Sequence, residues 1–161
     1  MKLIPRRWWS RLALVAFALF VLMQAVPYGR NHVNPPVGAE PAWDSPDTKA
    51  LARQACYDCH SNETSWPAYS YIAPASWLVQ RDVDNGREKL NFSEWQRPQE
   101  EADEAAEKVR EGEMPMPIYA LMHSHARLSP ADRARLAEGL AKTTGGAARD
   151  RAGEDGDDAG R

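Results

Sequence analysis

The pentapeptide Cys56-Tyr57-Asp58-Cys59-His60 contains both cysteines of the chain. C-x-x-C-H is the pattern on which haem is covalently attached in c-type cytochromes. In that chemistry the two thiols add to the vinyl groups of the porphyrin, and the adjacent imidazole binds the iron as its proximal ligand. The sequence therefore predicts one covalently attached haem c, held by Cys56, Cys59 and His60.

Three other interpretations of the pentapeptide compete with haem attachment. A thioredoxin-type redox pair requires a βαβ setting, and a structural zinc site requires two further Cys or His ligands at short spacing. The sequence around the motif indicates neither. A plain Cys56–Cys59 disulfide remains as an alternative, but it gives no role to His60.

Helix signals flank the motif on both sides, and no stretch alternates in the manner of a strand. Ser45 is expected to cap a helix that starts at Pro46 and leads into the motif. Further helices are predicted from Pro74 to Gly86, from about Pro98 to Glu111, and from Ser129-Pro130 onward with Leu128, Leu136 and Leu140 as its apolar stripe. The expected fold is an all-α, small cytochrome c-like domain built around the haem.

Electron transfer at this iron requires a sixth ligand, and a methionine thioether raises the reduction potential. The candidates are Met114, Met116, Met122, His123 and His125. Met114 follows the turn at Gly112, and Pro115 and Pro117 hold its loop extended, which favours Met114 and leaves Met116, and then Met122 or a histidine, as alternatives. Met122 is expected to pack in the core, and the two histidines to be exposed.

The N-terminal segment combines a basic start with an apolar run from Leu12 to Tyr28 that is interrupted at Gln24. As a helix this run spans about 25 Å, the short end for a membrane span. The basic residues before it are Lys2, Arg6, Arg7 and Arg11, against Arg30 after it. This bias predicts a single-pass anchor in the inner membrane, with the haem domain in the periplasm.

A cleaved signal peptide is the alternative for the same segment, because an h-region also follows basic residues. Met23-Gln24-Ala25-Val26-Pro27 is a poor cleavage site, since a bulky Met23 stands two residues before Ala25. An uncleaved anchor over residues 1–30 is the favoured prediction.

Composition divides the remaining chain into three segments. Residues 31–43 are rich in Pro and Gly and predict an extended linker. Residues 44–142 form the expected haem-binding domain. Residues 143–161 contain Gly, Ala, Asp and Arg without one large apolar side chain, and predict a disordered tail.

The net charge of the exported part favours some classes of binding partner over others. After Arg30 the chain has 15 Lys and Arg against 23 Asp and Glu, a net charge of −8. This balance disfavours nucleic acid and is compatible with a basic redox partner. The identity of the redox partner does not follow from the sequence.

Several stretches together carry a resemblance to a known family. They are Pro27-Tyr28-Gly29-Arg30-Asn31-His32, the motif with its flanks from Ala55 to Thr64, Ile72 to Leu78, Leu90 to Trp95, and Gly112-Glu113-Met114-Pro115. The chain resembles the bacterial haem-binding domain family of small exported proteins from about Pro27 to Leu140. The resemblance implies covalent haem on Cys56 and Cys59, His60 as proximal ligand, and Met114 as the methionine of the G-E-M-P motif. Met116-Pro117 departs from this pattern, so a second methionine stands beside the first.

The aromatic residues after the motif are abundant and could surround the porphyrin or pack as ordinary core. They are Trp66, Tyr69, Tyr71, Trp77 and Trp95. The expected function is one-electron transfer, with a haem sensor or ligand-binding module as the alternative. A peroxidase would require an open iron with an acid–base pair, and no distal His–Arg arrangement is evident, so an enzyme is not expected.

Overall fold

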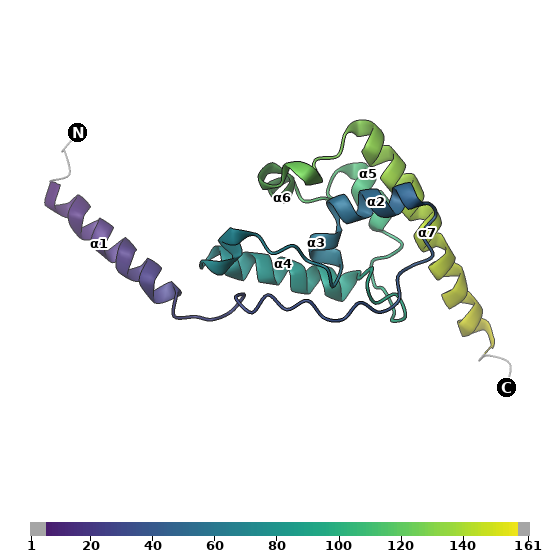
Figure 1. Cartoon of the computed structure of the whole chain (residues 1–161), viewed down its shortest axis with the longest axis horizontal. Coiled ribbons are helices and arrows are strands. Elements are labelled where there is room, and N and C mark those ends of the chain that lie inside the picture. The colour runs from purple at the N-terminus through teal and green to yellow at the C-terminus, as the bar shows by residue number, and fades with distance from the viewer. Residues whose placement is uncertain (1–5, 158–161) are drawn as a thin grey trace. The chain divides into compact units, whose positions relative to one another are not determined.

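The computed structural model describes the backbone of residues 6–157 and the side chains of residues 7–145. Residues 6–157 contain helices and no strand, which confirms the all-helical prediction (Figure 1). The elements in chain order are α1 (Arg6–Met23), α2 (Pro46–Ala55), α3 (Tyr57–His60), η1 (Ala68–Tyr71), α4 (Ala75–Lys89), α5 (Ala105–Glu111), α6 (Pro117–Met122), η2 (Ser124–Ala126) and α7 (Pro130–Asp157).

The chain divides into two compact units, and their boundaries differ from the predicted segments. The first unit comprises Met1–Val33 and Trp66–Asp82, and the second comprises Asn34–Ser65 and Val83–Arg161. Residues 66–82 thus group with the N-terminal segment, although the sequence placed them in the haem-binding domain. The second unit contains the C-x-x-C-H motif and every candidate iron ligand.

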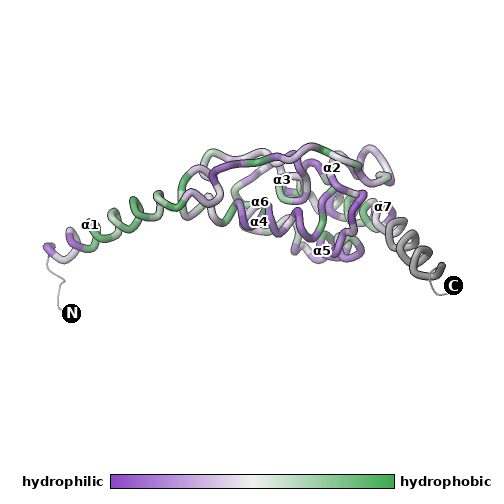
Figure 2. The backbone as a smooth tube through the Cα atoms, turned by 90° about the horizontal axis from the view of Figure 1, so that it is seen from below, coloured by the Kyte–Doolittle hydropathy of each residue, from purple (hydrophilic) through white to green (hydrophobic). Residues whose placement is uncertain are grey.

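In the first unit, α1 ends earlier than the predicted membrane segment. The chain turns after Met23, and the Gln24 side chain donates to the Ala73 carbonyl at 3.0 Å and accepts from the Ala73 amide at 3.1 Å. Large apolar side chains of α1 are exposed, among them Leu14 and Phe17, and Figure 2 shows the helix as largely hydrophobic. No described helix, however, has the length and apolarity of a membrane span, so the predicted transmembrane helix is not found among these residues.

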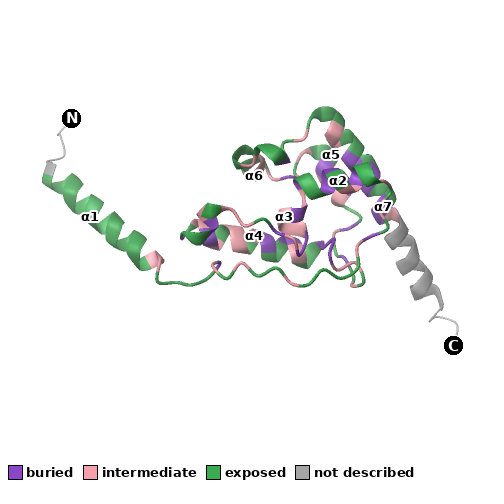
Figure 3. Cartoon of the chain, viewed as in Figure 1, coloured by how far each residue is buried: buried purple, intermediate pink, exposed green. Residues whose placement is uncertain are grey.

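The core of the second unit lies where α2, α5 and α7 pack together. Each helix contributes buried aliphatic side chains, and Figure 3 shows buried residues on all three. They include Leu51 and Ala52 of α2, Ala106 and Val109 of α5, and Leu136 and Leu140 of α7. This core fixes the end of α2, which leads directly into the motif.

Two predicted helix starts are confirmed by their caps. The Ser45 hydroxyl accepts a hydrogen bond from the Thr48 amide at 3.1 Å, and Pro46 occupies the first turn of α2. The Ser129 hydroxyl likewise accepts from the Asp132 amide at 3.1 Å at the start of α7. A capping hydroxyl satisfies an amide that has no partner inside the helix.

The segment predicted as a linker is extended, but much of it packs on the second unit. The Gly38 amide donates to the Ser93 carbonyl at 2.8 Å, and the Trp95 amide donates to the Ala39 carbonyl at 2.8 Å. The Asn34 side chain donates to the Thr64 carbonyl at 2.9 Å. Residues 34–43 are therefore part of the folded domain and not a free spacer.

Two interior helices have bounds that differ from the predicted ones. Helix α4 continues past Gly86 to Lys89, because that glycine lies in contact with the motif and does not end the helix. Helix α5 starts at Ala105 and not at Pro98. The buried Gln99 side chain accepts from the Asn91 amide at 2.7 Å and donates to the Glu94 carbonyl at 2.9 Å, which stabilises a loop over residues 94–99.

The predicted boundary between domain and tail falls inside α7. Thr143 and Thr144 are buried, and Thr143 accepts a hydrogen bond from the Asp44 amide at 3.1 Å. The backbone is helical as far as Asp157. The sequence instead predicted a disordered tail that begins at residue 143. Residues 158–161 of that prediction lie outside the described residues. The packed domain therefore includes at least Thr144.

Candidate functional site

The motif forms its own short helix at a bend after α2. Cys56 ends α2 with φ −122° and ψ −33°, and its carbonyl accepts from the Cys59 amide at 3.1 Å and the His60 amide at 2.9 Å. The bend redirects the chain, so α3 presents Cys59 and His60 from a separate element. The motif is thus a defined turn of helix and not a flexible loop.

Tyr57 anchors this short helix to the core. Its ring is buried and stacks on Phe92 with ring centroids 5.8 Å apart and an angle of 15° between the planes. Its hydroxyl donates to Glu40 at 3.2 Å. Tyr57 lies between the two cysteines and faces the core. Its contacts therefore fix the orientation of the motif that carries Cys56 and Cys59.

Gly86 allows α4 to lie directly against the motif. A Cβ atom at this position would lie 2.5 Å from the Cys59 carbonyl oxygen and 3.1 Å from the Cys59 Cβ. Any side chain would therefore force the motif away from the helix. The sequence suggested a helix end at this glycine, but its function is close packing.

The position of the His60 ring is set by the same helix. Its Nδ1 lies 3.0 Å from the Gly86 carbonyl oxygen and 3.0 Å from the Leu90 carbonyl oxygen. Carbonyl oxygens only accept, so Nδ1 carries the proton and Nε2 is left with a lone pair. Burial lowers the pKa of His60, which keeps the imidazole neutral near pH 7. A neutral imidazole whose Nδ1 proton is held by backbone carbonyls is the form that binds a metal through Nε2.

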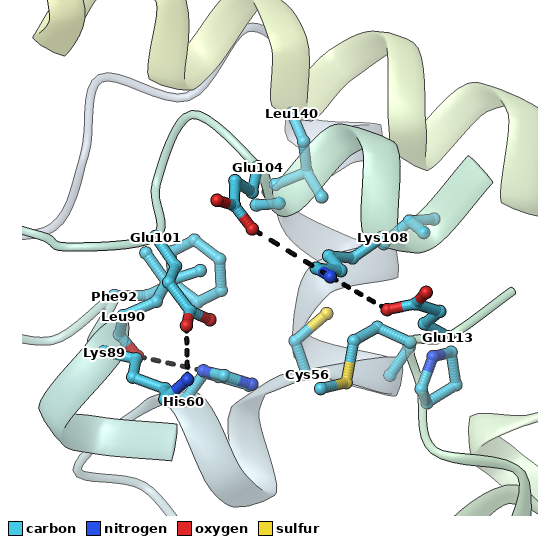
Figure 4. A pocket seen from close by; sticks show the side chains of 15 residues that line it. Cys56, His60, Lys89, Leu90, Phe92, Glu101, Glu104, Lys108, Glu113 and Leu140 are labelled. Atoms are coloured by element: carbon cyan, nitrogen blue, oxygen red, sulfur yellow. Dashed lines mark hydrogen bonds and ion pairs between the residues drawn. The ribbon is translucent and has the colours of Figure 1, made fainter. Parts of the chain in front are cut away.

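A cavity of about 240 Å³ brings together three of the four predicted site residues, Cys56, His60 and Met114 (Figure 4). Its apolar wall consists of Ala55, Leu90, Phe92, Ala105, Val109, Pro115 and Leu140. These residues come from α2, α5, α7 and the loops that follow α4 and α5. Burial raises the pKa of the Cys56 thiol to about 12, with a further contribution from Cys59, so the thiol is neutral at physiological pH.

Cys59 is not among the residues that line the cavity. It lies in α3, where its backbone and Cβ face Gly86. Neither cysteine forms a disulfide in this structure.

Met114 reaches the cavity from the turn that ends α5. Gly112 adopts φ +81°, a left-handed conformation that favours glycine, and its amide donates to the Val109 carbonyl at 3.2 Å. The Met114 amide donates to the Lys108 carbonyl at 3.1 Å, and Pro115 is buried. The turn is therefore held on both sides of Gly112, and Met114 is presented from a fixed backbone.

The other candidate ligands lie elsewhere. Met116, Met122, His123 and His125 are not among the residues that line the cavity. Met122 is 56% exposed, so the prediction that it packs in the core is wrong. His125 is exposed as predicted, whereas His123 is half-buried. Among the candidates only Met114 shares a cavity with His60.

Charged side chains at the cavity were not anticipated from the sequence. Lys89 pairs with Glu101, and Lys108 lies 2.9 Å from Glu113 and 3.9 Å from Glu104 (Figure 4). The hydrogen bond with Glu113 raises the pKa of Lys108. Two lysines and three glutamates thus border a cavity whose remaining lining is largely apolar, and each lysine is paired with glutamate.

The aromatic residues that follow the motif in the sequence lie in different parts of the structure. Phe92 is the aromatic residue that lines the cavity, and Trp95 stacks on it with centroids 6.1 Å apart. Trp66 stacks on His32 in the first unit at 4.6 Å, and Tyr71 meets the same ring edge-on at 4.2 Å. Of the five aromatic residues considered, Trp95 packs against the core beside Phe92, as the ordinary-core alternative expects.

The residues around the cavity fit a haem group. His60 and Met114 offer the nitrogen and sulfur ligands of an electron-transfer haem iron, and Cys56 offers a thiol beside them. Apolar walls match the porphyrin faces, and Lys89 and Lys108 are the cations of the lining, each paired with glutamate. This combination of donors and walls within one cavity is what a haem site requires.

Comparisons with known proteins agree with this geometry. No curated protein and no solved structure gives a match to the chain. The pattern of the haem-binding domain family matches residues 18–142, which include α2 to α6, the motif and Met114. That match extends over most of the 161 residues. The chain therefore belongs to the haem-binding domain family.

Proposed function

We propose that this haem protein is a c-type electron carrier, in which Cys56 and Cys59 would hold the haem covalently and His60 and Met114 would bind its iron. The observation that carries the proposal is the single cavity that Cys56, His60 and Met114 share. The haem supplies one-electron redox chemistry when it is bound. The chain supplies the attachment, the ligands and the exclusion of water.

Rigid ligands on both sides of the cavity support electron transfer over ligand binding. His60 is held by two backbone carbonyls, and Met114 follows a backbone that is bonded to α5 at Gly112 and Met114. A carrier keeps both axial positions filled in both redox states, so little rearrangement accompanies the transfer. We therefore propose an electron carrier without enzymatic turnover, which exchanges electrons with a redox partner protein.

Covalent attachment is the first test of the proposal. Matured by a c-type system, the protein is expected to retain its haem through acid–acetone extraction and to give the pyridine haemochrome of a two-thioether haem. Cys56→Ala and Cys59→Ala are each expected to give the spectrum of one thioether, because each thiol forms one bond. Met122→Ala, an exposed position, is the control and should match the unchanged protein. Complete extraction of haem from the unchanged protein would refute covalent attachment.

We further propose that residues 1–30 direct export and attach the haem domain to the inner membrane from the periplasmic side. The charge asymmetry around the apolar run and the exposed side chains of α1, such as Leu14 and Phe17, support this. The full chain is expected to stay with membranes in alkaline carbonate, and a chain that starts at Asn31 to be released. N-terminal sequencing of the mature protein that begins near Val26 would instead establish a cleaved signal peptide.

A further inference from the structure

The segment that follows the candidate ligand loop has little apolar anchorage. Helix α6 contains no buried residue, and Ile118, Leu121 and Met122 are 62%, 67% and 56% exposed. A short helix without a buried face gains almost nothing from the hydrophobic effect. Polar contacts must therefore contribute most of what holds α6 in place.

One of these contacts joins α6 to the C-x-x-C-H motif itself. The Tyr119 hydroxyl donates to the Asp58 carboxylate, and Asp58 lies between Cys56 and Cys59. The carboxylate side chain is only 21% exposed, and its other oxygen accepts from the Ser65 amide at 2.9 Å. A hydrogen bond to a partly buried, fixed carboxylate is stronger than one between neutral groups in water.

Further contacts hold the residues that follow α6. The Gln54 side chain in α2 donates to the His125 carbonyl at 2.6 Å, and Ala126 is buried beside it. The Arg127 guanidinium donates to the carbonyls of Ala120 and Leu121 at 2.8 Å and 2.7 Å, which closes the C-terminal end of α6. The segment is thus fixed to α2 and α3, the elements that carry the attachment motif.

Between Met114 and Tyr119 the chain has little freedom to absorb a movement. Pro115 and Pro117 fix φ at two of the four intervening positions. A displacement of Tyr119 therefore passes along the backbone to Met114. The hydrogen bond at one end and the thioether at the other belong to one stiff segment.

We propose that Tyr119 and Asp58 form a clamp that ties the loop carrying Met114 to the haem attachment motif, and that this clamp keeps the thioether on the iron. The inference rests on the proposed function, since it requires Met114 as a ligand. Tyr119 and Asp58 are positioning residues in this role.

The test uses the full holoprotein and the variant Tyr119→Phe, which retains the ring stacked on His123 at 4.2 Å and removes only the hydroxyl. Loss of a hydrogen bond to a charged group raises the population of the methionine-off state roughly tenfold. Carbon monoxide binding to the reduced protein is therefore expected to be about ten times faster. Amide hydrogen exchange in residues 114–123 should accelerate by a similar factor. Because the thioether still binds, the reduction potential should stay close to that of the unchanged protein.

Two further variants make the result specific. Asp58→Asn keeps the shape and the bond from Ser65 but removes the charge, so a smaller increase in the carbon monoxide rate is expected. The double variant should bind carbon monoxide no faster than Tyr119→Phe, because both changes break one interaction. Tyr71→Phe, an exposed tyrosine of the first unit, is the matched control and should leave the rate unchanged.

The outcomes separate this inference from the proposed function. Carbon monoxide rates for Tyr119→Phe within about twofold of the unchanged protein, with an intact iron–thioether absorption band, would refute the clamp and leave the carrier proposal standing. Persistence of that band in Met114→Ala would refute the ligand assignment, and the clamp with it. Additive effects in the double variant would show that Tyr119 and Asp58 act separately and would also refute the clamp.

Discussion

Replacing His60 with alanine is expected to abolish formation of a stable holoprotein. The imidazole is neutral, its Nδ1 proton is held by the Gly86 and Leu90 carbonyls, and its Nε2 is the nitrogen that remains for the iron. The variant loses the proximal ligand of the iron. A loss of about 1.4 kcal/mol in the free energy of haem binding already lowers the binding constant tenfold. The yield of mature haem protein should therefore fall by roughly tenfold or more, as measured from haem absorbance per unit of purified protein.

The control for this variant is Met122→Ala, which removes an exposed side chain of the same unit that does not line the cavity. Its holoprotein yield and spectrum should match those of the unchanged protein. Imidazole added to any His60→Ala protein that still carries haem should restore a low-spin spectrum, because the space left by the ring can accept the free ligand. Equal yields for the two alanine variants would contradict the assignment of His60.

The haem-binding family could be predicted from the sequence because the C-x-x-C-H pattern depends on neighbours in the chain. Two thiols and an imidazole within five residues have few other uses, and the caps at Ser45 and Ser129 are equally local signals. The place of Met114 in the cavity could also be predicted from the sequence, since Gly112 and Pro115 mark a rigid turn beside it. Each of these features requires only a few consecutive residues to be recognised.

The walls of the cavity could not be predicted in this way. Phe92, Lys108 and Leu140 come together only because α5 and α7 pack on α2, and no local pattern marks them as partners of Cys56. The same reason explains the error at residues 34–43. Their Pro and Gly content predicts an extended chain correctly, but it does not reveal that Ser93 and Trp95 supply the hydrogen bonds that bind this chain to the domain.

Replacing Met114 with alanine is expected to lower the reduction potential by roughly 0.1–0.3 V, within the range of about 0.8 V that axial ligation spans. A thioether stabilises the reduced iron, so its loss favours the oxidised form. The weak far-red absorption of the ferric iron–thioether bond should disappear in the same variant. Carbon monoxide should bind the reduced variant on the order of a hundredfold faster, if the methionine-off state of the unchanged protein is about 1% populated.

The matched control for this change is Met116→Ala, two residues along the same loop. Met116 does not line the cavity, whereas Met114 does, so the control should retain both the absorption band and the potential. Loss of the band in Met116→Ala alone would move the ligand to that residue. Rapid stoichiometric carbon monoxide binding by the unchanged protein would have a different meaning, because a carrier keeps its sixth position filled. That result would favour a haem sensor in which Met114 dissociates from the iron to admit a ligand. The strength of the Tyr119–Asp58 hydrogen bond would then determine how readily Met114 dissociates.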